Sequence, residues 1–349
     1  MMTQGDKPKL TSIESLGEFG LIDHLTLNNV SKNPETVKSV GDDAALIEVK
    51  DKLLIATKDL LLEGVHFDLV YTPLKHLGYK AIAVNLSDIY AMNGHPKQVI
   101  VGLGVSSKFS LEAMEEVYAG IYLACNKYGV DLVGGDTTAS QLGLVLSVTA
   151  LGQVERQKAV YRSGSKPNDL LCVTGNLGAA YCGLLVLQRE KAEFKANPQF
   201  QPDLKDYEYV LERQLKPEPR QDMINKLEAA GVVPTSMIDI SDGLASEVLH
   251  LCKNSGNSMM VYEKHIPIHN QTIAVANEFK INPTVCALSG GEDYELLFTI
   301  TQSDHEKIKA IEEISILGHV VESSVAPSLV TAAGQQVPLT AQGWDALKK

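Results

Sequence analysis

Two patterns of apolar residues take turns along the chain. In one, apolar residues recur with the period of a helix, and in the other they form a continuous run, as in a buried strand. The helical pattern is longest at 74–92, which ends at Asn93-Gly94, and at 111–127, which runs to Gly129. Short apolar runs between such stretches predict strands. We predict helices at 15–27, 74–92, 111–127, 175–187 and 244–252, and strands at 44–49, 53–57, 99–105, 132–133, 142–154, 169–174, 237–240, 259–262, 296–300 and 314–321.

Helices and strands interleave in both halves of the chain, so each half is predicted to be α+β or α/β. The 349 residues suffice for two domains, each with its own core. Charged, Gly and Ser residues interrupt the pattern across 152–166. We therefore expect one domain at 1–151 and a second at 152–349.

The composition is that of an ordinary globular protein, with 44% hydrophobic and 21% charged residues. Forty-three acidic residues against 31 basic ones give a net charge of −12, which argues against a general nucleic-acid or anionic-membrane surface. The five cysteines form no C-x-x-C pair, which favours reduced thiols. Residues 1–11 lack the apolar core of a signal peptide, and no stretch approaches the roughly 20 apolar residues of a membrane span, so we expect a cytoplasmic protein.

Most of six short acidic segments follow or interrupt apolar runs, where a solvated surface charge would be unusual. Carboxylates buried near one another repel, and each is costly without a partner. Hard cations such as Mg²⁺ accept several oxygen ligands and relieve that cost. If the six segments converge in the fold, we predict that the protein holds a nucleotide triphosphate through metal ions. The segments are Gly41-Asp42-Asp43, Lys58-Asp59, Asn85-Leu86-Ser87-Asp88, Gly134-Gly135-Asp136, Asp239-Ile240-Ser241-Asp242 and Gly290-Gly291-Glu292-Asp293.

Asp88 is the strongest single candidate, because it lies in a helix that is apolar on nearly every side. The alternative is a buried aspartate satisfied by the backbone or by an arginine. Asp59 and Asp136 are interpreted as strand-end residues, where α/β proteins bind ligands, although a tight turn explains a double glycine equally well. Asp242 is also explained as the N-cap of the next helix, and Asp42-Asp43 as a solvated turn.

The common nucleotide and metal motifs do not account for these acids. The sequence has no Walker A motif and no protein-kinase lysine or H-R-D motif. It also has no EF-hand spacing, H-E-x-x-H or cysteine cluster. A nucleotide site in this chain must be built in another way.

Seven longer motifs occur in a fixed order: Gly41-Asp42-Asp43-Ala44-Ala45, Asp59 with Glu63-Gly64-Val65-His66-Phe67, Asn85-Leu86-Ser87-Asp88, Gly134-Gly135-Asp136-Thr137-Thr138, Arg162-Ser163-Gly164, Asp239-Ile240-Ser241-Asp242-Gly243 and Ser289-Gly290-Gly291-Glu292-Asp293-Tyr294-Glu295-Leu296. Each is weak alone, but the ordered combination is specific. Over residues 15–345 the chain resembles the thiamine-monophosphate kinase family of the aminoimidazole-ribonucleotide-synthetase-like superfamily.

The resemblance implies ATP-dependent phosphorylation of thiamine monophosphate to thiamine diphosphate, with several Mg²⁺ ions and with ATP as co-substrate. It also implies an N-terminal α+β domain that pairs in a homodimer and a C-terminal α/β domain that closes over the site.

The resemblance also assigns site residues, motif by motif. The magnesium ligands would be Asp43, Thr57, Asp59, Asp88, Asp136, Asp239 and Asp242. Central to catalysis would be Asp43, Asp88, Asp136 and Asp239. Along the ATP would lie Gly135, Asp136, Arg162 and Ser241, and in contact with the thiamine phosphate His66, Glu292 and Trp344.

One position departs from the family pattern, because Lys58 stands where a hydroxyl residue usually precedes the aspartate of the second motif. Either the backbone carbonyl suffices for the metal, or the lysine ammonium replaces some cation charge and reaches a phosphate.

Two other functions stay open at this point. Another ATP-using member of the superfamily, such as aminoimidazole ribonucleotide synthetase, has a similar pattern, although the His66 segment and the Gly-Gly-Glu-Asp-Tyr-Glu-Leu run favour the thiamine enzyme. A non-catalytic nucleotide or metal sensor would retain the acidic residues without turnover.

Overall fold

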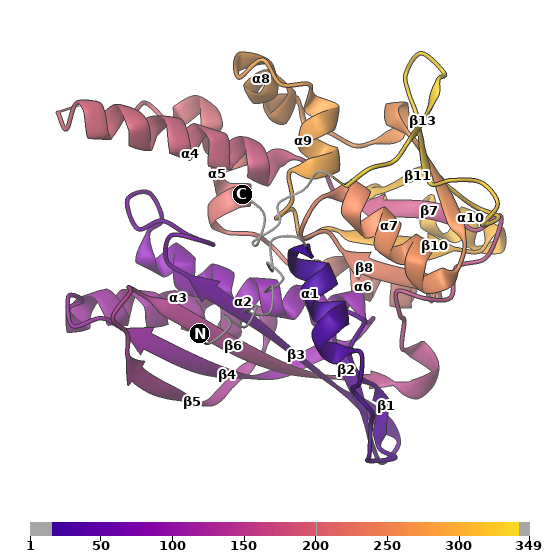
Figure 1. Ribbon diagram of the computed structural model, residues 1–349, viewed down its shortest axis with the longest axis horizontal. Helices are drawn as coiled ribbons and strands as arrows, with labels where there is room; N and C mark the ends of the chain where they lie inside the picture. Colours follow the sequence, from indigo (N-terminus) through magenta and orange to yellow (C-terminus); the bar gives the residue numbers. More distant parts are fainter. Residues whose placement is uncertain (1–15, 200, 342–349) are drawn as a thin grey trace, which may run out of the picture.

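The computed structural model describes residues 16–199 and 201–341, which form two mixed sheets, one in each half of the chain (Figure 1). The first sheet has the strand order β1-β2-β3-β6-β4-β5, and the second has the order β13-β12-β9-β11-β7-β10-β8. Helices pack against both sheets, so the expected two-part α+β and α/β architecture is confirmed. The division at residue 151 stays a prediction; β6 ends at Glu155 and β7 begins at Leu170.

The first sheet has helix α2 against one face, and none of the described helices covers its other face, which we call the open face (Figure 1). Residues of β3 alternate between buried positions that face α2, such as Leu53 and Leu61, and positions on the opposite face, such as Leu60, which is 48% exposed. Its elements are α1 (Gly17–Thr26), β1 (Thr36–Lys38), β2 (Ala45–Val49), β3 (Lys52–Leu62), α2 (Leu74–Ala91), β4 (His95–Val105), α3 (Leu111–Tyr128), β5 (Asp131–Ala139) and β6 (Val145–Glu155).

Helix α2 is buried on most sides because the first sheet, α3 and parts of the second half all contact it. Two glycines allow its close approach to α3: a Cβ on Gly78 would lie 1.9 Å from the Val117 carbonyl oxygen, and one on Gly120 would lie 1.9 Å from that of Lys75. The helix therefore lies at the junction of the two sheets. A polar side chain on its far end, such as Asp88, is placed between the two halves of the chain.

The prediction that a strand ends at the double glycine is wrong. Strand β5 runs through Gly134 and Gly135 to Ala139 and pairs with β4 in parallel. A Cβ on Gly135 would lie 2.1 Å from the carbonyl oxygen of Val101 on β4. The glycine is therefore required by the close approach of two strands and not by a turn.

The second half follows the predicted order of elements, although α4 extends to Ala196, beyond the predicted end at 187. Its elements are β7 (Leu170–Thr174), α4 (Ala179–Ala196), α5 (Glu208–Leu215), α6 (Gln221–Ala229), β8 (Ser236–Asp239), α7 (Leu244–Ser255), β9 (Ser258–Tyr262), α8 (Asn270–Glu278), α9 (Pro283–Ser289), β10 (Leu296–Ile300), α10 (His305–Ile308), β11 (Ile314–Val321), β12 (Ser328–Val330) and β13 (Gln336–Pro338). The five cysteines are buried free thiols. Among the described helices, none combines the length and apolarity that crossing a bilayer requires.

Candidate active site

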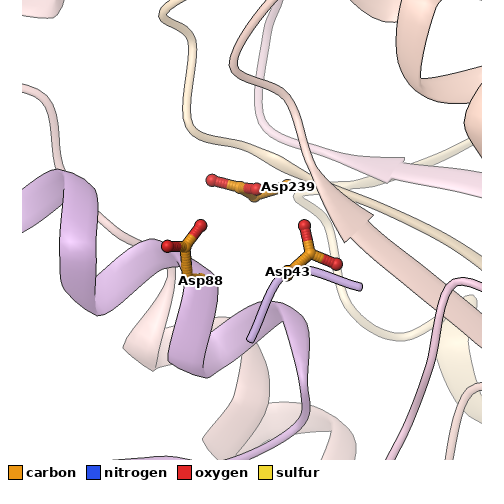
Figure 2. A group of neighbouring side chains, drawn as sticks. All are labelled: Asp43, Asp88 and Asp239. Carbon is orange, nitrogen blue, oxygen red and sulfur yellow. The ribbon is translucent and has the colours of Figure 1, made fainter. Parts of the chain in front are cut away.

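Three carboxylates from distant parts of the sequence meet between the two halves of the molecule. Asp43 precedes β2, Asp88 lies on α2, and Asp239 is the last residue of β8. One oxygen from each lies within 4.8 Å of the other two. Figure 2 shows the three side chains directed toward one another. We call these three residues the aspartate cluster.

Hydroxyl groups hold two members of the aspartate cluster in place. Thr57 on β3 donates to Asp88 Oδ2 at 2.5 Å, and Ser87 on α2 donates to Asp239 Oδ2 at 2.6 Å. The second bond joins the two halves of the chain. Asp88 is therefore held from within the first half, whereas the bond to Asp239 forms only when both halves pack together.

Asp59 lies near the cluster. The prediction that it lies at the end of a strand is wrong, because β3 continues to Leu62. Its backbone N–H donates to the side-chain oxygen of Asn85, three residues before Asp88 on the same face of α2. Burial raises the pKa of Asp59 to about 6. Asp59 also raises the pKa of Asp88, which places the two carboxyl groups in the same crowded region.

Arg162 supplies positive charge at the rim of the aspartate cluster. Its Nε donates to Asp43 Oδ2 at 3.1 Å and its terminal nitrogen donates to Asp43 Oδ1 at 2.8 Å, a two-pronged contact. Its backbone N–H donates to Asp42 Oδ1 at 3.0 Å. One cation thus pairs with one carboxylate of the cluster, while Asp88 and Asp239 receive hydroxyl donors.

Burial and the repulsion of neighbouring carboxylates disfavour ionisation of Asp88 and Asp239. Burial, together with the charge of Asp43, raises the pKa of Asp239 to about 8. Burial and the charges of Asp59, Asp239 and Asp43 raise the pKa of Asp88 well above its usual value. A divalent cation would reverse these shifts, because it favours the ionised carboxylates. The ligand atoms are all oxygens, which are the donors that Mg²⁺ prefers, so the residues present fit that ion.

Added Mg²⁺ is expected to stabilise this protein more at pH 8 than at pH 6. The folded-state pKa of Asp239 is raised from 3.8 to about 8. Between those values the folded protein keeps a proton that the unfolded chain has lost, so the metal-free protein loses stability as the pH rises. Bound Mg²⁺ removes this penalty and displaces the proton.

Thermal unfolding with and without MgCl₂ at both pH values checks the expectation. Asp239→Asn should reduce the pH dependence, and Asp88, whose pKa is also raised, should account for the part that remains. An equal Mg²⁺-induced shift at pH 6 and pH 8 in the parent protein would contradict it.

The prediction that Asp242 caps helix α7 is wrong, because the N-cap is Gly243 and no side chain caps this end. The backbone N–H of Asp242 donates instead to Glu247 Oε1 at 3.0 Å. Glu247 is 2% exposed, and its second carboxyl oxygen has no partner within residues 16–199 and 201–341. Sequence reasoning missed Glu247; an acid in the first turn of the helix after Asp239-Ile240-Ser241-Asp242 was the available signal.

Asp136 is not part of the aspartate cluster within one chain. It is exposed on the edge strand β5. Its ladder row runs through Gly102 on β4 and Ser147 on β6 to Leu60 on β3. Paired residues project from the same face, so Asp136 and Leu60 point away from α2. The roles assigned to Gly135 and Asp136 stay predictions.

Lys58 does not reach the aspartate cluster. Neighbouring residues of a strand point to opposite faces, so Lys58 projects away from Thr57 and Asp59, onto the open face of the sheet. Its ammonium donates to Ser147 Oγ on β6. Any charge that Lys58 contributes therefore acts on the Asp136 side of the sheet.

Two of the residues assigned to the thiamine phosphate, His66 and Glu292, belong to a second polar group, together with Lys80. Glu292 pairs with Lys80 on α2 at 2.8 Å, and its charge, like that of Lys80, affects His66. His66 accepts the Leu62 backbone N–H at Nδ1, and burial lowers its pKa, so the neutral ring carries its proton on Nε2. Trp344 lies outside the described residues.

The two glycine-rich loops around Ser241 and Glu292 pack directly on each other. The backbone N–H of Glu292 donates to the Ser241 carbonyl oxygen at 2.6 Å. A Cβ on Gly291, whose φ is +71°, would lie 2.5 Å from that same oxygen. This contact explains why a glycine is needed at position 291, and it links the segment that follows Asp239 to Glu292.

Comparisons with known proteins agree with this arrangement. Residues 41–154 match the family model described as AIR synthase related protein, N-terminal domain. The thiamine-monophosphate kinase of Bacillus subtilis (strain 168) is 34% identical over 339 residues, covering 95% of this chain and 100% of that protein. The thiamine-monophosphate kinase of Aquifex aeolicus (strain VF5) is 35% identical over 288 residues, covering 82% of this chain and 87% of that protein.

Solved structures give the same result. A structure of AaThiL complexed with AMPPCP and TMP superposes with a TM-score of 0.83 at 31% identity, covering 96% of this chain and 99% of that chain. A structure of thiamine-monophosphate kinase from Stenotrophomonas maltophilia K279a superposes with a TM-score of 0.70 at 30% identity, covering 92% and 98%. The resemblance drawn from the ordered motifs is confirmed, and the chain belongs to the thiamine-monophosphate kinase family.

Proposed function

We propose that this protein is a kinase that transfers a phosphoryl group from ATP to thiamine monophosphate and forms thiamine diphosphate. The observation that carries the proposal is the aspartate cluster, built from both halves of a chain that belongs to this family. A related structure is named as a complex with AMPPCP and TMP, a donor analogue and an acceptor. ATP is accordingly the co-substrate.

Transfer between two phosphates needs alignment and charge neutralisation more than it needs a nucleophilic side chain. The acceptor phosphate is already anionic and can attack without losing a proton to a base. The obstacle is the repulsion between two polyanions. We propose that Mg²⁺ ions held by the aspartate cluster, with Thr57 and Asp59 nearby, would offset that charge. Asp242 is proposed as a further ligand on the resemblance alone.

The remaining assigned residues divide between the two substrates. Arg162 contacts Asp43 of the cluster, and Ser241 follows Asp239 by two residues. Both are proposed to border the ATP phosphates, with Arg162 also keeping Asp43 oriented. His66 and Glu292 are proposed to contact thiamine monophosphate, with His66 donating through Nε2. Trp344 is proposed for the thiamine rings on the resemblance alone.

We also propose that two copies pair through the open face of the first sheet. Leu60 and Ile100 on this face are 48% and 39% exposed, and Asp136 projects from the same face. Pairing would bury the apolar residues and bring Asp136 to the interface, where it could act with a second copy. A light-scattering mass of a single chain at micromolar concentration would contradict the pairing.

The direct test is incubation of the purified protein with ATP, MgCl₂ and thiamine monophosphate, followed by chromatographic detection of thiamine diphosphate. We expect stoichiometric formation of thiamine diphosphate and ADP, and no product when EDTA is in excess. Stabilisation by Mg-ATP without product from thiamine monophosphate would favour the sensor. Turnover only with the substrate of aminoimidazole ribonucleotide synthetase would favour that enzyme.

A further inference from the structure

A buried lysine holds the carboxylate of Glu292 from behind. Lys80 is 4% exposed, and its ammonium donates to Glu292 Oε1 at 2.8 Å and to the backbone oxygen of Gln214 at 3.2 Å. The side-chain amide of Gln214 donates to Glu292 Oε2 at 2.7 Å. Each oxygen of the carboxylate therefore has its own donor, and the three residues form a closed arrangement through the Gln214 backbone.

The three residues come from separate parts of the fold. Lys80 lies on α2 of the first half, Gln214 lies on α5, and Glu292 lies between α9 and β10. Lys80 also precedes Asp88 by eight residues, about two helical turns, so both project from the same side of α2. One helix thus carries a member of the aspartate cluster at one end and a partner of Glu292 nearer the other.

The backbone at Glu292 is in a conformation that its surroundings must maintain. Its φ is +57°, and Tyr294 has a φ of +51°. Left-handed conformations are unfavourable for residues other than glycine and persist where the surrounding contacts determine them. The Glu292 N–H is held by Ser241, and its side chain is held by Lys80 and Gln214.

The held carboxylate is still accessible. The side chain of Glu292 is 31% exposed, whereas that of Lys80 is 5% exposed. The charge of Glu292 acts on both His66 and Tyr71, which places two ring side chains near it. Gln214 is buried, and its Oε1 has no hydrogen-bond partner among residues 16–199 and 201–341. A partly exposed carboxylate with ring side chains nearby suits a flat cationic ligand that carries N–H donors.

We propose that Lys80, with Gln214, is a positioning residue for the acceptor: it fixes Glu292 in the orientation that receives the aminopyrimidine and thiazolium groups of thiamine monophosphate. This inference rests on the proposed function. An ion pair that merely joins the two halves would be a poor source of stability, because desolvation offsets much of its attraction. If Lys80 positions Glu292, its removal should weaken the binding of thiamine monophosphate and leave the binding of ATP unchanged.

The test is steady-state kinetics on Lys80→Met, with each substrate varied in turn. The KM for thiamine monophosphate should rise by about tenfold or more, as expected when a charged hydrogen bond to the group that holds the ligand is lost. The KM for ATP should change by less than about twofold on the same argument. Lys127→Met is the matched control, because Lys127 also pairs across the two halves, with Glu218, but on α3. We expect it to leave both KM values unchanged.

A double variant separates positioning from simple packing. If Lys80 acts through Glu292, then Lys80→Met combined with Glu292→Gln should have the acceptor KM of Glu292→Gln alone. Additive losses would overturn the inference, as would an unchanged acceptor KM in Lys80→Met. If Lys80→Met does not fold, Gln214→Met removes the other donor to Glu292. The same changes in the two KM values are then expected of Gln214→Met, and an unchanged acceptor KM would overturn the inference. If the parent protein shows no activity, the proposed function is wrong. Calorimetric titration with thiamine monophosphate would then test whether Lys80→Met weakens acceptor binding, and equal affinity in the parent and the variant would overturn the inference.

Discussion

Asp88→Asn is expected to lower the turnover number by about two orders of magnitude or more, the loss typical of removing one electrostatic group from a reaction centre. The side chain keeps its shape but loses the charge that the aspartate cluster offers to a cation. The fold should be unaffected, because in the metal-free protein Asp88 is crowded by other carboxyl groups and its pKa is raised. Removing that repulsion should leave the melting temperature unchanged or higher.

Turnover and thermal unfolding, measured on the same preparation, check both parts of this expectation. Asp51→Asn is the matched control, since Asp51 is exposed in the turn between β2 and β3 and is expected to have no effect on either quantity. Near-normal turnover of Asp88→Asn would remove Asp88 from the reaction centre. A large fall in its melting temperature would show that the carboxylate has a structural role instead.

Glu295→Ala is expected to lower the free energy of unfolding by roughly 3–5 kcal/mol, the cost of breaking a buried ion pair on one side. Glu295 is 1% exposed and pairs with Arg213 at 2.8 Å and Arg220 at 2.6 Å. It also accepts a hydrogen bond from Thr174. Its removal leaves two largely buried guanidinium groups without their shared counter-charge.

Urea unfolding of the parent and the variant gives the difference directly. Glu313→Ala is the control, because Glu313 also pairs with Arg220 but its side chain is 52% exposed. Exposed pairs contribute about 0–1 kcal/mol, so Glu313→Ala should be nearly neutral. Equal effects of the two substitutions would contradict the argument that burial decides the cost.

The strongly patterned elements could be predicted from the sequence alone. Helices at 74–92 and 111–127 and strands at 296–300 and 314–321 match the structure to within about a residue, because local period and turn residues determine them. The segment around Gly134-Gly135 was misread. A glycine indicates backbone freedom or close approach, and only the pairing of β4 with β5 shows that close approach is the cause.

For the site, the acidic residues could be identified but not their partners. The convergence of Asp43, Asp88 and Asp239 agrees with the cost of burying unpaired carboxylates. Lys80 was overlooked although it lies in the same apolar helix as Asp88, since its counter-charge is more than 200 residues away in sequence. Arg162 was assigned to ATP, and the structure adds its contact with Asp43. Ion pairs between distant segments depend on tertiary packing and leave no local signal.

The most direct test of the account is the position of a divalent ion in crystals grown with MnCl₂ and a non-hydrolysable ATP analogue. Mn²⁺ takes the same oxygen ligands as Mg²⁺ and can be located by its anomalous scattering. We predict a peak within coordination distance of Asp43, Asp88 and Asp239, lost in Asp88→Asn crystals. Bound nucleotide with no peak at the aspartate cluster would contradict the claim that carboxylates from both halves hold the metal between donor and acceptor.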